Sequence, residues 1–138
     1  MPIRPALRGF YPIDWHELSR AIRFRRAGGR CEGCSRPHGI EVATIGGAWL
    51  DEDVGVWRDQ RGRRTTLPYQ PQVARMTHTR LQCAHVDHDP THNASRNLRA
   101  WCGRCHLAHD REEHRRQRRL TYLLRRAIGD LFEGEYQL

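Results

Sequence analysis

The chain has 138 residues, 38% of them hydrophobic, and carries a formal net charge of +8 at pH 7. This length suits one ordinary domain, and so few apolar residues leave a modest core that a bound metal would help to stabilise. No apolar run approaches the roughly 18 residues that a membrane span needs, and the N-terminus lacks the apolar stretch of a signal peptide. The charge therefore favours nucleic acid over a membrane surface as partner, and we expect a cytoplasmic location.

The first half of the chain predicts an arm, a helix and a set of hairpins. Residues 1–13 contain three prolines and are expected to be extended. A helix is predicted to begin after Asp14 and to end at Gly28 and Gly29. Residues 40–75 hold β-branched and aromatic runs broken by glycines, which is typical of β-hairpins.

The second half predicts a strand, a polar loop, a short strand and a long helix. Thr79, Leu81, Cys83 and His85 alternate on one face of the first strand. The helix is expected to start within the segment Cys102–Cys105 and to run without interruption to Gly129. The sequence thus predicts an α+β protein with a single domain over residues 14–138, a core over about 76–128 and inserted hairpins over about 40–75.

Two CxxC pairs predict a structural Zn²⁺ site, with Cys31, Cys34, Cys102 and Cys105 as its ligands. Tetrahedral Zn²⁺ accepts four thiolates, and a CxxC turn places two sulfurs on the same side of the chain. A redox dithiol is the alternative, but no thioredoxin-like βαβ pattern accompanies the pairs. The fifth cysteine, Cys83, is expected to be a buried packing residue.

The segment that follows Gln82 resembles the HNH endonuclease family, also called the ββα-metal nucleases. The similarity rests on the order of His85 at the end of a strand, Asn97 in a loop and His106 directly after the second CxxC pair. This order is similar to that of small HNH proteins of phages, zinc-knuckle variants among them. The resemblance implies a ββα-metal core clamped by a four-cysteine zinc knuckle, in a bacterial cell or a phage-infected host.

The resemblance also implies an activity and a role for each residue. The expected activity is metal-dependent hydrolysis of phosphodiester bonds in double-stranded DNA by a one-metal mechanism. His85 would be the general base, Asn97 would fix the loop and orient His85, and His106 would bind Mg²⁺ or another divalent ion. Asp110, four residues after His106, is a further candidate ligand of that ion.

One departure from the family leaves alternatives open. Many members carry a metal-binding His or Asp immediately before the general base, and Ala84 occupies that position here. The ion could then be held by His106 and Asp110, with another side chain filling in from the set His109, Asp87 and His88. Asp87 and His88 could themselves form a ligand and base pair, although the spacing from His85 to Asn97 and to Cys102 fits the family better.

Two functions without catalysis remain as alternatives. The first is a zinc-stabilised DNA-binding module with a vestigial, inactive HNH site, and the second is an interaction protein whose basic face meets an acidic protein. Whether the chain cuts DNA or only binds it, arginines would contact the DNA backbone. The candidates near the core and on the long helix are Arg96, Arg99, Arg104, Arg115 and Arg118.

Overall fold

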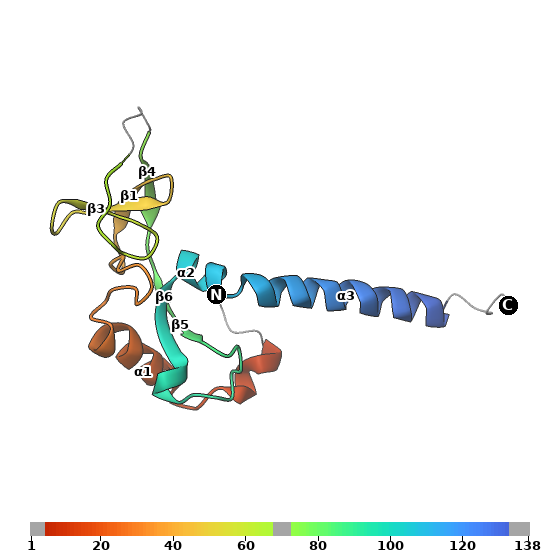
Figure 1. Ribbon diagram of the computed structural model, residues 1–138. Coiled ribbons are helices and arrows are strands. Elements are labelled where there is room, and N and C mark those ends of the chain that lie inside the picture. The colour runs from red at the N-terminus through yellow and green to blue at the C-terminus, as the bar shows by residue number, and fades with distance from the viewer. Residues whose placement is uncertain (1–4, 68–72, 133–138) are drawn as a thin grey trace. The chain divides into compact units, whose positions relative to one another are not determined.

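A computed structural model describes residues 5–67 and 73–132. The chain divides into two compact units, Met1–His106 and Leu107–Leu138, and each is described by itself. The described residues form an α+β fold with three α-helices and two antiparallel sheets (Figure 1). The α+β class predicted from the sequence is therefore confirmed.

The N-terminal part of the first unit is more helical than the sequence predicts. Pro5–Phe10 forms a 3-10 helix in place of an extended arm. The predicted helix is present as α1, Trp15–Arg20, which widens into a π-helical segment over Ala21–Arg26. Asp14 precedes α1, but its side chain makes no capping hydrogen bond.

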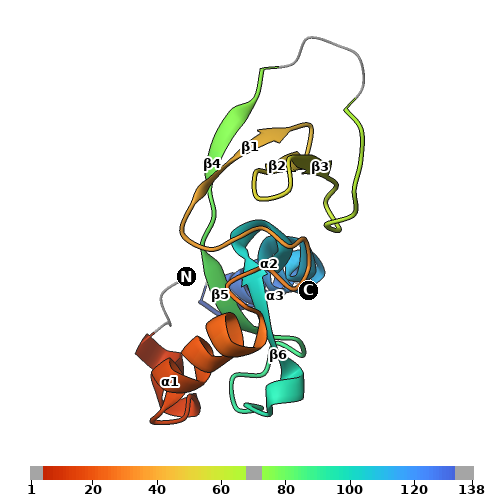
Figure 2. The same ribbon diagram turned by 90° about the vertical axis from the view of Figure 1, so that its left-hand side faces the viewer.

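The predicted hairpins form a four-stranded antiparallel sheet. Its strands are β1 (Glu41–Ile45), β2 (Ala48–Asp51), β3 (Val56–Arg58) and β4 (Arg75–His78). They are ordered β3-β2-β1-β4, so that β4 returns to pair with the first strand of the insertion. Figure 2 shows β4 leading directly into the second sheet.

The second sheet is a hairpin of β5 (Leu81–His85) and β6 (Leu98–Cys102). The single strand predicted over residues 79–85 is interrupted at its start, because Thr79 belongs to the base of the insertion. The Thr79 N–H donates to the Ile40 carbonyl at 2.9 Å, and its carbonyl accepts from the Gly39 N–H at 2.7 Å. The chain thus passes from one sheet to the other between β4 and β5.

Both ends of the β5–β6 hairpin are buried by residues that precede the insertion. At one end, Leu81 packs with Cys31, Cys34 and Cys102. At the other end, the buried residues Ile22, Leu98 and Ala100 form a cluster, against which Trp15, Leu18, Ala27 and Cys83 pack. The core therefore sits on the hairpin and holds its register.

The predicted long helix is two helices. The first, α2, spans Gly103–His109, and the second, α3, spans Arg111–Phe132, with Asp110 as the turn residue between them. On α3, which belongs to the second unit, Leu120, Leu123 and Leu124 are exposed. No helix among the residues described here has both the length and the apolar character of a membrane span.

Candidate functional site

The two predicted CxxC pairs come together in the first unit. The sulfurs of Cys31, Cys34, Cys102 and Cys105 all lie within 4.8 Å of one another. The Cys34 and Cys102 sulfurs are 3.6 Å apart. Tetrahedral Zn²⁺ with bonds of about 2.3 Å separates its sulfurs by about 3.8 Å, so the spacing fits zinc. The buried cluster is consistent with the predicted structural Zn²⁺ site.

Hydrogen bonds to sulfur make the cluster suited to thiolates. Cys31 Sγ accepts from the backbone N–H of Gly33 at 3.4 Å and of Cys102 at 3.2 Å. The Arg36 guanidinium donates to Cys34 Sγ at 3.7 Å. Donors of this kind offset the negative charge that four thiolates would place around a divalent ion.

The thiols also act on one another. The hydrogen bond from the Cys105 thiol, followed by those from Cys31 and Cys34, lowers the pKa of Cys102. The hydrogen bond with Cys102 in turn raises the pKa of Cys34 and that of Cys105. The mutual bonds therefore favour the thiolate, which is the form that binds a metal, at Cys102 but not at all four sulfurs.

Cys83 lies outside this cluster, and it is half-buried rather than buried as predicted. It packs in β5 against the buried cluster of Ile22, Leu98 and Ala100. Burial is the main cause that raises the pKa of the Cys83 thiol to about 11. Cys83 is therefore a neutral packing residue at physiological pH.

His85 ends β5 and is held by aromatic rings from the N-terminal segment. Its ring stacks on that of Trp15, with centroids 5.3 Å apart and planes at 10°, and the Tyr11 ring meets it edge-on at 5.6 Å. The sequence does not predict these contacts, because it indicates a helix after Asp14 but not the strand against which that helix packs.

The His85 ring is oriented by Asn93 rather than by a direct bond to Asn97. The Asn93 amide group donates to the carbonyls of Pro90 and Thr91, at 3.0 and 3.1 Å, so its Oδ1 faces His85 Nε2 at 2.9 Å. Because Oδ1 only accepts, Nε2 carries a proton. Nδ1 is then the nitrogen of neutral His85 that can take a proton.

Asn97 organises the loop between the two strands. It is buried, and its amide group donates to Asp87 Oδ1 and to the His92 carbonyl, both at 2.8 Å. Its own oxygen accepts from the Asp87 N–H at 3.3 Å. Asn97 thus ties Asp87 and His92, two residues of the loop, to the start of β6.

The Asp87 carboxylate is exposed yet strongly held in its ionised form. The hydrogen bond from Asn97, then that from the Asp89 N–H and that from His92 Nδ1, lower the pKa of Asp87 well below its usual range. The His92 bond is 2.6 Å long. An ionised carboxylate is thus fixed immediately before the exposed His88, a residue whose φ is +63°.

His106 lies on α2 directly after Cys105, the last residue of the four-cysteine cluster. Its Nδ1 bonds Gln82 Oε1 at 2.6 Å, and its ring lies 6.4 Å from that of Trp101. A metal-binding histidine typically donates its other ring N–H to such a partner. If His106 binds a metal ion, it would therefore bind it through Nε2.

His85 and His106 are not brought together. Strand residues alternate between faces, and His85 pairs with Leu98 whereas Gln82 pairs with Trp101. His85 therefore shares the face covered by Trp15, and Gln82 presents its bond to His106 on the opposite face. Asp110, in the second unit, is the turn residue before α3. Its role as a ligand stays a prediction.

The predicted DNA-contacting arginines fall into separate groups. Arg99 donates to the carbonyls of Arg96 and Leu98 at the start of β6. Arg115 and Arg118 are exposed on α3. That these arginines contact the DNA backbone stays a prediction.

Comparison with protein-family models, with curated proteins and with solved structures yields no significant match. The site is therefore interpreted from its own geometry.

Proposed function

We propose that the chain is a zinc-stabilised, metal-dependent endonuclease that hydrolyses phosphodiester bonds of double-stranded DNA. The four-cysteine cluster would hold Zn²⁺ and fix both the end of β6 and the start of α2. The order of β5, loop, β6 and α2 supports the proposal, because it is the order that the HNH resemblance implies. The net charge of +8 supports DNA as the substrate.

The observation that carries the proposal is the bond between Asn97 and Asp87. It fixes an ionised carboxylate at the position immediately before His88. Many members of the HNH family carry a metal ligand at the position before the general base, and Ala84 cannot serve as such a ligand before His85. Asp87 would then be a ligand of Mg²⁺ or another divalent ion, and His106 stays the further ligand that the resemblance implies. Such an ion supplies charge neutralisation at the phosphate and at the departing oxygen.

The geometry favours His88 over His85 as the general base. His88 is exposed in the loop beside Asp87, whereas His85 is stacked between aromatic rings on the face opposite Gln82 and His106. An imidazole suits the role, because its ordinary pKa of about 6.5 lies close to neutral pH. In this proposal, His85 with its Trp15 and Asn93 contacts supports the hairpin end that carries the loop.

The runner-up function is a zinc-stabilised DNA-binding module without catalysis. The separation of His85 from His106 favours this second function. The resemblance implies that these two residues act together as base and metal ligand, but they lie on opposite faces of the β5–β6 hairpin. Zinc and arginines would then supply only fold and affinity. DNA binding that weakens steeply with salt is expected for both functions.

Nicking of supercoiled plasmid in Mg²⁺ or Mn²⁺ tests these proposals. We expect His88→Ala and Asp87→Asn to lower the rate by about 100-fold or more, the usual contribution of a general base. His85→Ala should retain more activity than His88→Ala, and His114→Ala, an exposed residue on α3, is the matched histidine control.

Each result distinguishes one assignment from another. Loss of nicking in His85→Ala with full activity in His88→Ala would restore His85 as the base. DNA binding by a zinc-loaded wild-type chain that never nicks would establish the binding module instead.

A further inference from the structure

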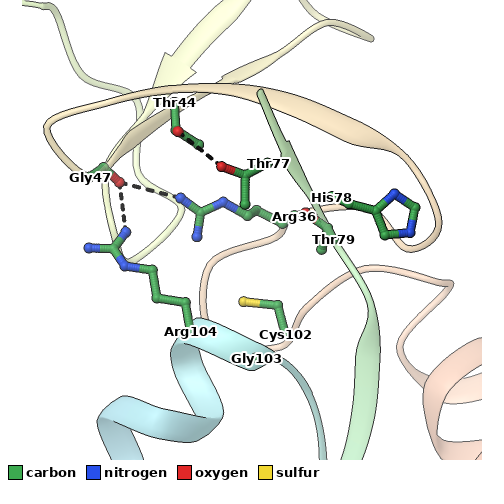
Figure 3. Close-up of a pocket in the computed structure, with 9 residues that line it drawn as sticks. All are labelled: Arg36, Thr44, Gly47, Thr77, His78, Thr79, Cys102, Gly103 and Arg104. Carbon is green, nitrogen blue, oxygen red and sulfur yellow. Dashed lines mark hydrogen bonds between the residues drawn. The ribbon is translucent and has the colours of Figure 1, made fainter. Parts of the chain in front are cut away.

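A cavity of about 310 Å³ lies in the first unit between the insertion and the zinc cluster. Two arginines reach it from different directions: Arg36 follows the first CxxC pair, and Arg104 lies in α2. Figure 3 shows both guanidinium groups converging on the carbonyl of Gly47. The lining residues include these two arginines and one histidine, and no acidic residue is among them.

Arg36 is buried in this cavity with unused hydrogen-bonding capacity. Its side chain is 4% exposed, and it bonds Cys34 Sγ and, at 3.4 Å, the Gly47 carbonyl. Its buried Nε has no hydrogen-bond partner within the described part of the chain. Such a donor is costly to leave unpaired, so an acceptor in the cavity would be favoured.

Thr79, which follows β4, is a second buried residue of the cavity with an unpaired polar group. The residue is 3% exposed, and its buried Oγ1 also has no partner among the residues that the structure covers. By contrast, the neighbouring hydroxyls of Thr44 and Thr77 bond each other at 3.2 Å. A hydroxyl can donate a hydrogen bond to an anion, so the unpaired groups of Thr79 and Arg36 could both donate to the same anionic ligand.

Arg104 adds a second charge at the mouth of the cavity. It is exposed and donates through Nη1 to the Gly47 carbonyl at 2.7 Å. A Cβ at Gly47 would lie 3.0 Å from Arg104 Nη2, and the φ of Gly47 is +96°. Glycine at position 47 thus permits the close approach that aims Arg104 at the cavity.

From these contacts we propose that the cavity is a binding site for a phosphate group, held by Arg36, Arg104 and Thr79. Guanidinium groups match the several acceptor oxygens of phosphate, and the cavity leaves room for an ester substituent. The group would come from a DNA backbone or from a free phosphate compound. The proposal does not depend on hydrolysis or on the identity of the general base.

The cavity is placed away from the loop that carries Asp87. It lies at the Cys102 end of β6, whereas the loop follows His85 at the opposite end of the hairpin. Four residue steps of strand separate these ends, which is roughly 13 Å. A DNA strand of several nucleotides could therefore reach both places.

Titration of the zinc-loaded full chain with inorganic phosphate tests the site, with potassium chloride of equal ionic strength as reference. Phosphate should raise the unfolding temperature of the wild type, and Arg104→Gln should weaken its binding at least tenfold. Arg61→Gln removes an equal charge from an exposed turn and should bind as the wild type does.

Thr79→Val gives an independent readout, because it replaces a buried unpaired hydroxyl with a methyl group of the same shape. It should fold at least as stably as the wild type and bind phosphate more weakly. Equal responses to phosphate in the wild type, Arg104→Gln and Thr79→Val would overturn the proposal and leave Arg36 as a neutraliser of the thiolates only.

Competition with a 20-base-pair duplex separates the two sources of phosphate. If the group belongs to DNA, phosphate should displace the duplex from the wild type more than chloride does, and Arg104→Gln should lose that difference. Phosphate binding that leaves duplex affinity unchanged would assign the site to a free phosphate compound.

Discussion

The imidazole of His85 lies parallel to the indole of Trp15, with the ring centroids 5.3 Å apart. This stack joins helix α1 to the end of strand β5. It fixes the plane of His85 while Asn93 fixes its protonated nitrogen. Two residues that the HNH resemblance does not include thus determine the geometry of one of its key residues.

Replacing Trp15 should release His85. In Trp15→Leu the ring current of the indole is lost, so the His85 carbon-bound protons should move downfield in NMR spectra. Because Trp15 is only partly buried, we expect a loss of about 2 kcal/mol in the free energy of unfolding. Trp57→Leu, in β3 of the other sheet, is the control, and unchanged His85 shifts in Trp15→Leu would contradict the stack.

Zinc removal should unfold the first unit. We expect one Zn²⁺ per chain, and Cys31→Ser or Cys105→Ser should lose it together with most of the thermal stability, because zinc affinity is coupled to folding. Cys83→Ser should retain the metal, since Cys83 lies outside the cluster. Metal content by elemental analysis and melting curves with a chelator check both expectations.

The two knuckle glycines should respond oppositely to alanine. A Cβ at Gly33 would lie 3.0 Å from Cys105 Sγ, whereas one at Gly103 would meet nothing within 4 Å. Gly33→Ala should weaken zinc retention against a chelator. Gly103→Ala should keep zinc and stabilise α2 by about 0.5 kcal/mol through helix propensity. Equal zinc retention in the two variants would refute the close packing at Gly33.

Ionisation of the Cys83 thiol should lower the free energy of unfolding at alkaline pH. Its pKa is raised to about 11, so the protonated thiol favours the folded state. This contribution is fully present below about pH 8.5, the pKa of an ordinary thiol, and is lost as the pH rises toward 11. Cys83→Ala should lack this part of the decline in unfolding free energy.

The rate of alkylation gives a second measurement of the raised pKa of the Cys83 thiol. At pH 8 the folded, zinc-loaded chain should react with iodoacetamide about a hundredfold more slowly than an exposed thiol, because so little thiolate is present. Mass spectrometry identifies the labelled cysteine. Rapid labelling of Cys83 would show that burial does not protect it.

The four-cysteine cluster could be predicted because its signal in the sequence is local. Each CxxC pair brings two sulfurs together by itself, and four thiolates suit one ion whatever chain lies between the pairs. The presence of hairpins could be predicted for the same reason, since glycine turns and alternation are short-range patterns.

The surroundings of His85 could not be predicted, because they are tertiary. Nothing in the loop tells Asn93 from Asn97 as the partner of His85, and only the fold brings Trp15 to the same place. The start of α3 after Asp110 has a local signal, because Asp110 followed three residues later by Glu113 has the form of a capping box. The sequence equally allows Asp110 to be a ligand one helical turn after His106, and this interpretation hides the break. The strand break at Thr79 is hidden because alternation continues through it, while its backbone is bonded to Gly39 and Ile40.

Those backbone bonds at Thr79 close the base of the four-stranded sheet. The chain enters the four-stranded sheet at Ile40 and leaves it at Thr79, two residues whose backbones are hydrogen-bonded to each other. A short turn could bridge this gap, but a chain without the sheet would lose the fully buried Trp49, whose Nε1 donates to the Cys34 carbonyl at 3.1 Å. The sheet therefore covers the first CxxC pair and, through Gly47, also forms one wall of the cavity that Arg36 and Arg104 line.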